Sequence, residues 1–252
     1  MARTNNVQSY LGAITRGPLD QKEIAFCFTA HSYAEGASTI LDTLKKHRAK
    51  GSFFLTGEFV ANTNVASIID RMLSEGHYLG PHSDKHLLYC AWEPSRKTLV
   101  SREAFMEDLE ANITKIEKRQ ALARTKNGVA ANTLRPVRYF LPPYEHYNET
   151  IAQWTGQAGI TLVNFTPGTR SAADYTGEAD KNFVSSQTIY DSILAKENSD
   201  PHGLNGFMLL LHLGAGPGRA DKFHTRFPEL CEWLNRRGYR FVSIDEMLQG
   251  FE

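Results

Sequence analysis

The feature that most constrains the fold is a regular alternation of short apolar segments with amphipathic ones. The apolar segments, which are typical of buried strands, are residues 24–28, 52–55, 77–79, 138–141, 160–165, 206–211 and 240–242. Between them, apolar residues recur at helical spacing over 38–47, 65–74, 101–119, 148–157, 185–196 and 223–237. Buried strands that alternate with helices indicate a parallel sheet with helices on its outer face. We therefore expect an α/β fold that closes, or nearly closes, into a barrel.

Length and composition are consistent with one globular unit. A chain of 252 residues can form a single large barrel, and its 41% hydrophobic and 22% charged residues are ordinary for a soluble protein. We expect one catalytic domain over residues 1–252, in which residues 1–22 form an N-terminal extension.

The charge balance argues against several kinds of partner. Lys plus Arg and Asp plus Glu both total 28, so the formal net charge is zero and a nucleic-acid surface is not expected. The longest apolar stretch, residues 207–211, is too short to span a membrane. Residues 1–10 are polar and contain no signal core, which fits a cytoplasmic protein or an exported domain without its leader. No heptad or apolar stripe indicates an oligomeric state.

Two histidines suggest a metal site. His82 and His86 are four residues apart and follow the break at Gly80-Pro81. Imidazole is a common ligand of zinc and other first-row metals, although such a spacing also arises by chance in polar loops. In a barrel, functional residues gather at the carboxyl ends of the strands, and His31 and His212 also follow apolar strands. The shared location favours a metal-dependent active site.

Five sequence blocks resemble the polysaccharide deacetylases of carbohydrate esterase family 4. They are Ile40-Leu-Asp-Thr-Leu-Lys-Lys-His47, Gly51-Ser-Phe-Phe-Leu-Thr-Gly-Glu58, Glu75-Gly-His-Tyr-Leu-Gly-Pro-His82, Phe140-Leu-Pro-Pro-Tyr144 and Leu209-Leu-Leu-His212. The resemblance implies a deformed (β/α)7 barrel and a bacterial, exported hydrolase of carbohydrate metabolism. Such an enzyme uses a divalent metal, most often zinc, to remove acetyl groups from a glycan.

The resemblance also implies roles for particular residues. His82 and His86 match the two metal-binding histidines, and His212 matches the general acid that protonates the leaving amine. Tyr144 matches the tyrosine whose backbone N–H stabilises the oxyanion. These groups are coherent chemically, because a metal polarises the carbonyl while a backbone donor complements the developing negative charge.

The first family motif departs from its usual form. That motif normally contains two aspartates, the general base and the third metal ligand, but here it reads Cys27-Phe28-Thr29-Ala30-His31. In the fourth block, Leu141 replaces the usual arginine, and Glu145 replaces the glycine after the tyrosine. The base and one ligand are therefore missing from their usual positions.

Three explanations follow. In the first, which we favour, His31 rather than Glu35 is the third ligand, and Glu145, Glu35 or Asp84 replaces the base, with Glu145 preferred. In the second, the chain is a catalytically silent barrel that binds carbohydrate. In the third, the same site hydrolyses another amide or ester on a modified glycan.

Three further residues are candidates for substrate binding. Asp174 could pair with His212, and Arg170 could hold a carboxylate of the substrate or an acetate ion. Trp92 follows the histidine pair and could stack on a sugar ring, although core packing would explain it equally well. Arg170 and Asp174 could also form an ordinary surface pair in a turn-rich loop.

Overall fold

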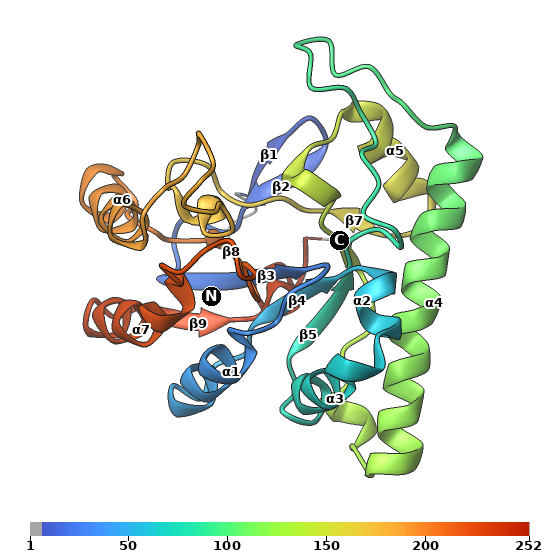
Figure 1. Cartoon of the computed structure of the whole chain (residues 1–252), viewed down its shortest axis with the longest axis horizontal. Helices are drawn as coiled ribbons and strands as arrows, with labels where there is room; N and C mark the ends of the chain where they lie inside the picture. The colour runs from blue at the N-terminus through green and yellow to red at the C-terminus, as the bar shows by residue number, and fades with distance from the viewer. Residues whose placement is uncertain (1–6, 252) are drawn as a thin grey trace.

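A five-stranded parallel sheet lies at the centre of the computed structural model, which describes residues 7–251 (Figure 1). The first six residues of the expected N-terminal extension and Glu252 lie outside the described residues. The sheet contains β3 (Glu23–Ala30), β4 (Ser52–Leu55), β5 (Tyr78–Pro81), β8 (Phe207–His212) and β9 (Arg240–Val242). One edge of β3 pairs with β8, and its other edge pairs with β9 near the start and β4 near the end. The predicted α/β fold with a parallel sheet is confirmed.

Two smaller sheets complete the strand arrangement. β6 (Tyr139–Phe140) pairs with β7 (Thr161–Leu162) in parallel, and β1 (Gln8–Tyr10) forms an antiparallel hairpin with β2 (Ala13–Arg16). The Leu141 amide donates to the Pro81 carbonyl at 3.3 Å, which links β6 to β5, and a bridge from Ile14 to Val163 links β2 to β7. The Thr166 amide donates to the Met208 carbonyl of β8 at 3.0 Å. These bonds arrange the three sheets around a common interior.

Within residues 7–251, eight α-helices surround the strands, and α4 extends along one whole side of the molecule (Figure 1). They are α1 (Ala37–Lys46), α2 (Gly57–Ala61), α3 (Ala66–Ser74), α4 (Arg102–Asn127), α5 (Glu149–Gln157), α6 (Ser186–Ser199), α7 (Phe227–Arg236) and α8 (Ile244–Met247). Helix α4 continues eight residues beyond its predicted end at residue 119. It ends where Gly128 adopts a left-handed conformation, with φ of 65°.

The N-terminal hairpin and α2 were not predicted from the sequence. The hairpin turns at Leu11 and Gly12, whose φ values of 46° and 83° are those of a tight two-residue turn. A Leu-Gly pair is a weak turn signal, and the β1 side chains are exposed, so no apolar alternation marks the strand. Helix α2 has only five residues, which is too short for a helical period to be visible.

The two faces of the sheet have different neighbours. Ile24, Phe26 and Phe28 of β3 face the helices and pack with residues of α1, α3 and α7. Ala25 and Cys27 face the interior instead, where they pack with Met208 and Leu210 of β8 and with Tyr78 of β5. Because side chains alternate along a strand, the last inward positions of β3 and β8 are Thr29 and His212, which are register partners.

A glycine is required where β5 ends. Gly80 lies next to Phe54 on the interior side of β4, and a Cβ atom at Gly80 would lie 2.8 Å from the Phe54 ring. The missing side chain allows β5 to approach β4 closely just before Pro81 and His82. The Gly-Pro break thus has a packing role, and the loop that carries His82 and His86 follows it directly.

Within residues 7–251, no helix has both the length and the apolar character needed to cross a bilayer.

Replacing Phe26 by Ala should destabilise the protein by about 3–5 kcal/mol, because the ring packs against Phe28, Phe227 and Phe241 and leaves a cavity when removed. Urea unfolding monitored by circular dichroism would measure the change in the free energy of unfolding. Leu99→Ala is the matched control, since Leu99 is 54% exposed and should cost less than about 0.5 kcal/mol. Equal costs for the two variants would contradict the assigned core.

Candidate active site

A cavity of about 370 Å³ opens at the carboxyl ends of β3, β5 and β8. Its lining combines residues from distant parts of the chain. Seven of the residues singled out in the sequence line it: His31, His82, His86, Trp92, Tyr144, Glu145 and His212. The fold therefore brings these predicted site residues together around one cavity.

His82 and His86 lie on the loop that follows β5, with ring centroids 5.1 Å apart. The Nδ1 of His82 donates to the Leu141 carbonyl at 2.7 Å, which leaves Nε2 available. Burial lowers the pKa of His82 well below its usual value, and the nearby His86 adds to this effect. Burial, followed by the neighbouring His31 and His212, lowers the pKa of His86 to about 4. Both rings are thus neutral near pH 7, the form in which imidazole binds a metal.

Side chains of helix α4 bind the backbone of this loop. The Asp108 carboxylate accepts hydrogen bonds from the Asp84 amide at 2.9 Å and the Lys85 amide at 3.2 Å, and the Asn112 Oδ1 accepts from the His82 amide at 2.8 Å. Lys115 pairs with the Asp84 carboxylate at 2.6 Å. Asp84, one of the three candidate bases, is thus engaged with α4 and does not line the cavity. Asp108 and Asn112 were missed in the sequence, where polar residues four apart on a helix suggest only a solvent-exposed face.

His31 lies beside the histidine pair but has other partners. Its ring is parallel to that of His86 within 19°, with centroids 4.9 Å apart. Its Nδ1 is 3.2 Å from the Thr56 hydroxyl, and its Nε2 is 4.0 Å from Glu58. Within residues 7–251, no group of three or more His, Cys, Asp or Glu side chains is arranged to hold a metal ion. His31, His82 and His86 line one cavity, but in this arrangement their side chains are not positioned as a metal-binding group.

Tyr144 and Glu145 belong to a sharp turn, η3 (Pro143–Glu145), and both line the cavity. Both have left-handed backbones, with φ of 59° and 53°, which is unusual for residues other than glycine. The Glu145 and His146 amides donate to the carbonyls of Pro142 and Pro143, whereas the Tyr144 amide has no acceptor among the described residues. Burial raises the pKa of Glu145 to about 7, with His212 opposing the rise and Asp174 adding to it. The turn therefore presents a titratable carboxyl and a free donor.

His212 is oriented by Asp174. The Nδ1 of His212 donates to one oxygen of the Asp174 carboxylate at 2.6 Å, and the His212 amide donates to the other at 2.9 Å. Burial disfavours the charged ring, but the buried Asp174 carboxylate outweighs it and raises the pKa of His212 above its usual value. The pair leaves the Nε2 of His212 for a substrate, as a general acid requires.

Aromatic side chains surround the cavity. Of the six large hydrophobic side chains that are exposed in residues 7–251, four line it: Tyr33, Trp92, Tyr144 and Tyr175. Tyr33 was not singled out in the sequence, because a lone tyrosine near a strand end carries no distinctive signal. Trp92 is 63% exposed, so the core-packing alternative does not describe it. Exposed aromatic rings around a cavity are suited to stacking on sugar rings.

Two other predicted residues lie just outside this cavity. Arg170 lines a second cavity, of about 420 Å³, which shares Trp92, Tyr144, Glu145 and Tyr175 with the first. Glu35 accepts hydrogen bonds from the Ala215 and Gly216 amides and from Lys222, and it lines neither cavity. Glu35 therefore stabilises the glycine-rich loop after β8, which is residues 213–218.

The polysaccharide deacetylase family model matches residues 16–163, which is more than half of the chain. The chain belongs to this family. A peptidoglycan-N-acetylglucosamine deacetylase of Bacillus cereus is 26% identical over 246 residues, covering 96% of this chain and 74% of that protein. A peptidoglycan-N-acetylmuramic acid deacetylase of Bacillus subtilis, PdaA, is 24% identical, covering 97% of this chain and 78% of that protein.

Solved structures of the same family share the fold. The PdaA structure, described as a family 4 carbohydrate esterase, gives a TM-score of 0.70, covering 96% of this chain and 87% of that one. A carbohydrate esterase family 4 pseudoenzyme from Bacillus anthracis gives a TM-score of 0.69 at 17% identity, covering 96% of this chain and 70% of that one. The fold of this polysaccharide deacetylase family member is thus found in proteins described as enzymes and in one described as a pseudoenzyme.

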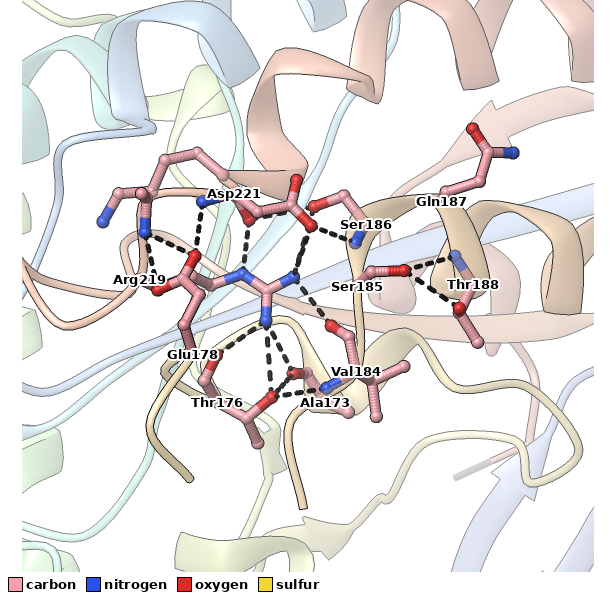
Figure 2. Close-up of polar contacts among 12 residues, drawn as sticks. Ala173, Thr176, Glu178, Val184, Ser185, Ser186, Gln187, Thr188, Arg219 and Asp221 are labelled. Atoms are coloured by element: carbon pink, nitrogen blue, oxygen red, sulfur yellow. Dashed lines mark hydrogen bonds and ion pairs between the residues drawn. The ribbon is translucent and has the colours of Figure 1, made fainter. Parts of the chain in front are cut away.

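Arg219 is a further residue that no pattern in the sequence distinguishes. Its side chain is completely buried, and Figure 2 shows its guanidinium at the centre of contacts with several loops. It donates to the Thr176 carbonyl at 2.7 Å and to the Val184 carbonyl at 2.9 Å. Arg219 lies after β8, and Thr176 follows Asp174 closely, so this arginine ties the Asp174 loop to the segment that follows His212. An arginine in a glycine-rich stretch resembles any surface residue, and only its burial shows this role.

Replacing Arg219 by Met should destabilise this family member by about 3–5 kcal/mol, because several buried carbonyl groups lose their donor. Thermal unfolding followed by calorimetry would measure the loss. Arg124→Met, which removes an exposed arginine of α4, should change the free energy of unfolding by less than about 0.5 kcal/mol. A fully stable Arg219 variant would show that the buried contacts are dispensable.

Proposed function

We propose that this chain is a metal-dependent glycan deacetylase in which other residues replace the two aspartates of the first family motif. The observation that carries the proposal is that one cavity combines the neutral His82–His86 pair, the Glu145 carboxyl, the free Tyr144 amide and the His212–Asp174 pair. Together they offer a metal-binding pair, a base, an oxyanion donor and an acid. The deacetylases among the relatives support an acetylated glycan, with an N-acetyl or O-acetyl sugar, as the substrate class.

His82 and His86 would hold the metal, and we propose His31 as the third donor because it adjoins His86 in the same cavity. Three imidazoles suit zinc, which we propose as the metal. When bound, the metal would polarise the acetyl carbonyl and lower the pKa of a water molecule.

Residues of the chain would carry out the proton transfers and stabilise the oxyanion. Glu145 accepts a proton from the attacking water, and the Tyr144 amide donates a hydrogen bond to the oxygen that becomes negatively charged. His212 transfers its Nε2 proton to the leaving nitrogen as the carbon–nitrogen bond breaks, which releases acetate and a free amine; for an O-acetyl substrate, the leaving oxygen takes that proton. Asp174 keeps His212 in the correct tautomer throughout.

A silent carbohydrate-binding barrel is the second candidate. Thr29 and Ala30, which line the cavity, occupy the two positions of the family's aspartates, and a carboxylate is absent from both. The aromatic side chains around the cavity would bind sugars without catalysis. Acetate release from acetylated oligosaccharides by zinc-loaded protein would favour the deacetylase, and glycan binding without acetate release would favour the silent barrel.

We also propose that the protein acts outside the cytoplasm as a single catalytic domain. The support for this location is that the relatives act on peptidoglycan, according to their names, and that acetylated glycans lie mostly outside the bacterial cytoplasm.

Glu145→Gln should lower the rate of acetate release by about 10²–10⁴-fold, because the general base is lost. In the unmodified protein the rate should rise with pH through about 7, where Glu145 loses its proton, and fall at higher pH as His212 loses its own. A pH–rate profile of the variant should lack the acidic limb in its residual activity. Glu35→Gln, a carboxylate outside the cavity, should retain both limbs; an unchanged acidic limb in Glu145→Gln would exclude Glu145 as the base.

His31→Ala should weaken zinc binding about as much as His82→Ala, if His31 is the third donor. Isothermal titration calorimetry with zinc alone measures the affinity without any substrate. His224→Ala is the control, since His224 lies outside the cavity lining and should leave the affinity unchanged. Unaltered zinc affinity in His31→Ala would remove His31 from the ligand set.

A further inference from the structure

The second cavity continues the active-site cavity on the side of residues 165–182. The two share Trp92, Tyr144, Glu145 and Tyr175, so a ligand that fills one extends directly into the other. The lining specific to the second cavity includes Phe165, Thr169, Arg170 and Asn182. An apolar ring beside hydroxyl, amide and guanidinium groups is the composition expected of a sugar subsite.

Trp92 forms a fixed platform between the two cavities. Its ring stacks on His146, with centroids 4.2 Å apart and planes within 26°. The Nε2 of His146 donates to the Ala91 carbonyl at 2.8 Å, which fixes the imidazole under the indole. A held, exposed indole supports a second sugar unit beside the one at the catalytic residues.

Arg170 supplies the charge of the second cavity. Its guanidinium is exposed and has no hydrogen bond or ion pair with any of the described residues, while its backbone amide is anchored to Ser192 Oγ at 2.9 Å. Among the lining residues, Glu145 is the only acid, and it belongs to the catalytic cavity. An unpaired arginine can take a carboxylate with two parallel hydrogen bonds, which a neutral sugar cannot offer.

We propose that this second cavity is a subsite for a carboxylate-bearing unit next to the acetylated sugar, with Arg170 as the specificity-determining residue. The inference rests on the proposed function, since it names the substrate class of the same site. The substrate would be an acidic glycan, and neutral acetylated glycans would bind more weakly. The carboxylate has two possible sources, the sugar itself or a peptide attached to it.

Binding of three probes to the zinc-loaded protein tests the proposal by calorimetry. They are a neutral N-acetylated chitooligosaccharide, peptide-free glycan strands whose muramic acid units carry carboxylates, and the same strands with peptides attached. We expect at least one acidic probe to bind about tenfold more tightly than the neutral one, and Arg170→Gln to abolish that difference. Preference for peptide-free strands assigns the carboxylate to the sugar, and preference for peptide-bearing strands assigns it to the peptide.

Lys126→Gln is the matched control, because it removes one positive charge from the last turn of α4 and Lys126 lines neither cavity. It should keep the preference for acidic probes. Equal binding of all three probes, or a preference that survives Arg170→Gln, overturns the subsite. Acetate release is measured in parallel: a preference dependent on Arg170 without acetate release retains the subsite and rejects the deacetylase.

Discussion

The pairing of β3 with β8 is the constraint on which the candidate site depends. Thr29 and His212 are partners in this register, and both are the last inward positions of strands whose other face is buried under helices. A slip of β8 by one residue would turn Leu211 inward and His212 toward the helices, which the apolar core opposes. The energy that fixes His212 at the cavity is therefore the packing of Phe26, Phe28 and Leu211 on the opposite face.

The loops around the cavity are fixed by buried polar residues from elsewhere in the chain. Asp108 and Asn112 of α4 bind the backbone of the histidine loop, and Arg219 binds the backbone near Asp174. Loops lack regular backbone pairing, so their amides and carbonyls need such partners when they are covered. These residues stabilise the site without belonging to its chemistry, and they are buried as deeply as the apolar core.

The two aspartates of the first family motif are absent, so the carboxyl group of the candidate site comes from another segment of the chain. Thr29 and Ala30 leave the β3 side without a carboxylate, while Glu145 places one on the turn after β6, near His212. The left-handed turn that carries Glu145 also leaves the Tyr144 amide free, so the proposed base and the proposed oxyanion donor come from one strained segment. A protein described as a pseudoenzyme has the same fold, so the fold alone does not carry the chemistry.

The sequence by itself determined the α/β class, the order of the long elements and seven of the residues around the cavity, because hydrophobic periodicity and strand-end histidines are local signals. It missed the β1–β2 hairpin, α2 and the last eight residues of α4, where the periodic signal is short or weak. Only the tertiary structure decided that Arg219, Asp108 and Asn112 are buried supports, that Asp84 and Glu35 bind other partners, and that Arg170 belongs to a second cavity. The physical reason is that burial and polar pairing depend on which distant segments meet, whereas strand and helix periods depend only on neighbours in the chain.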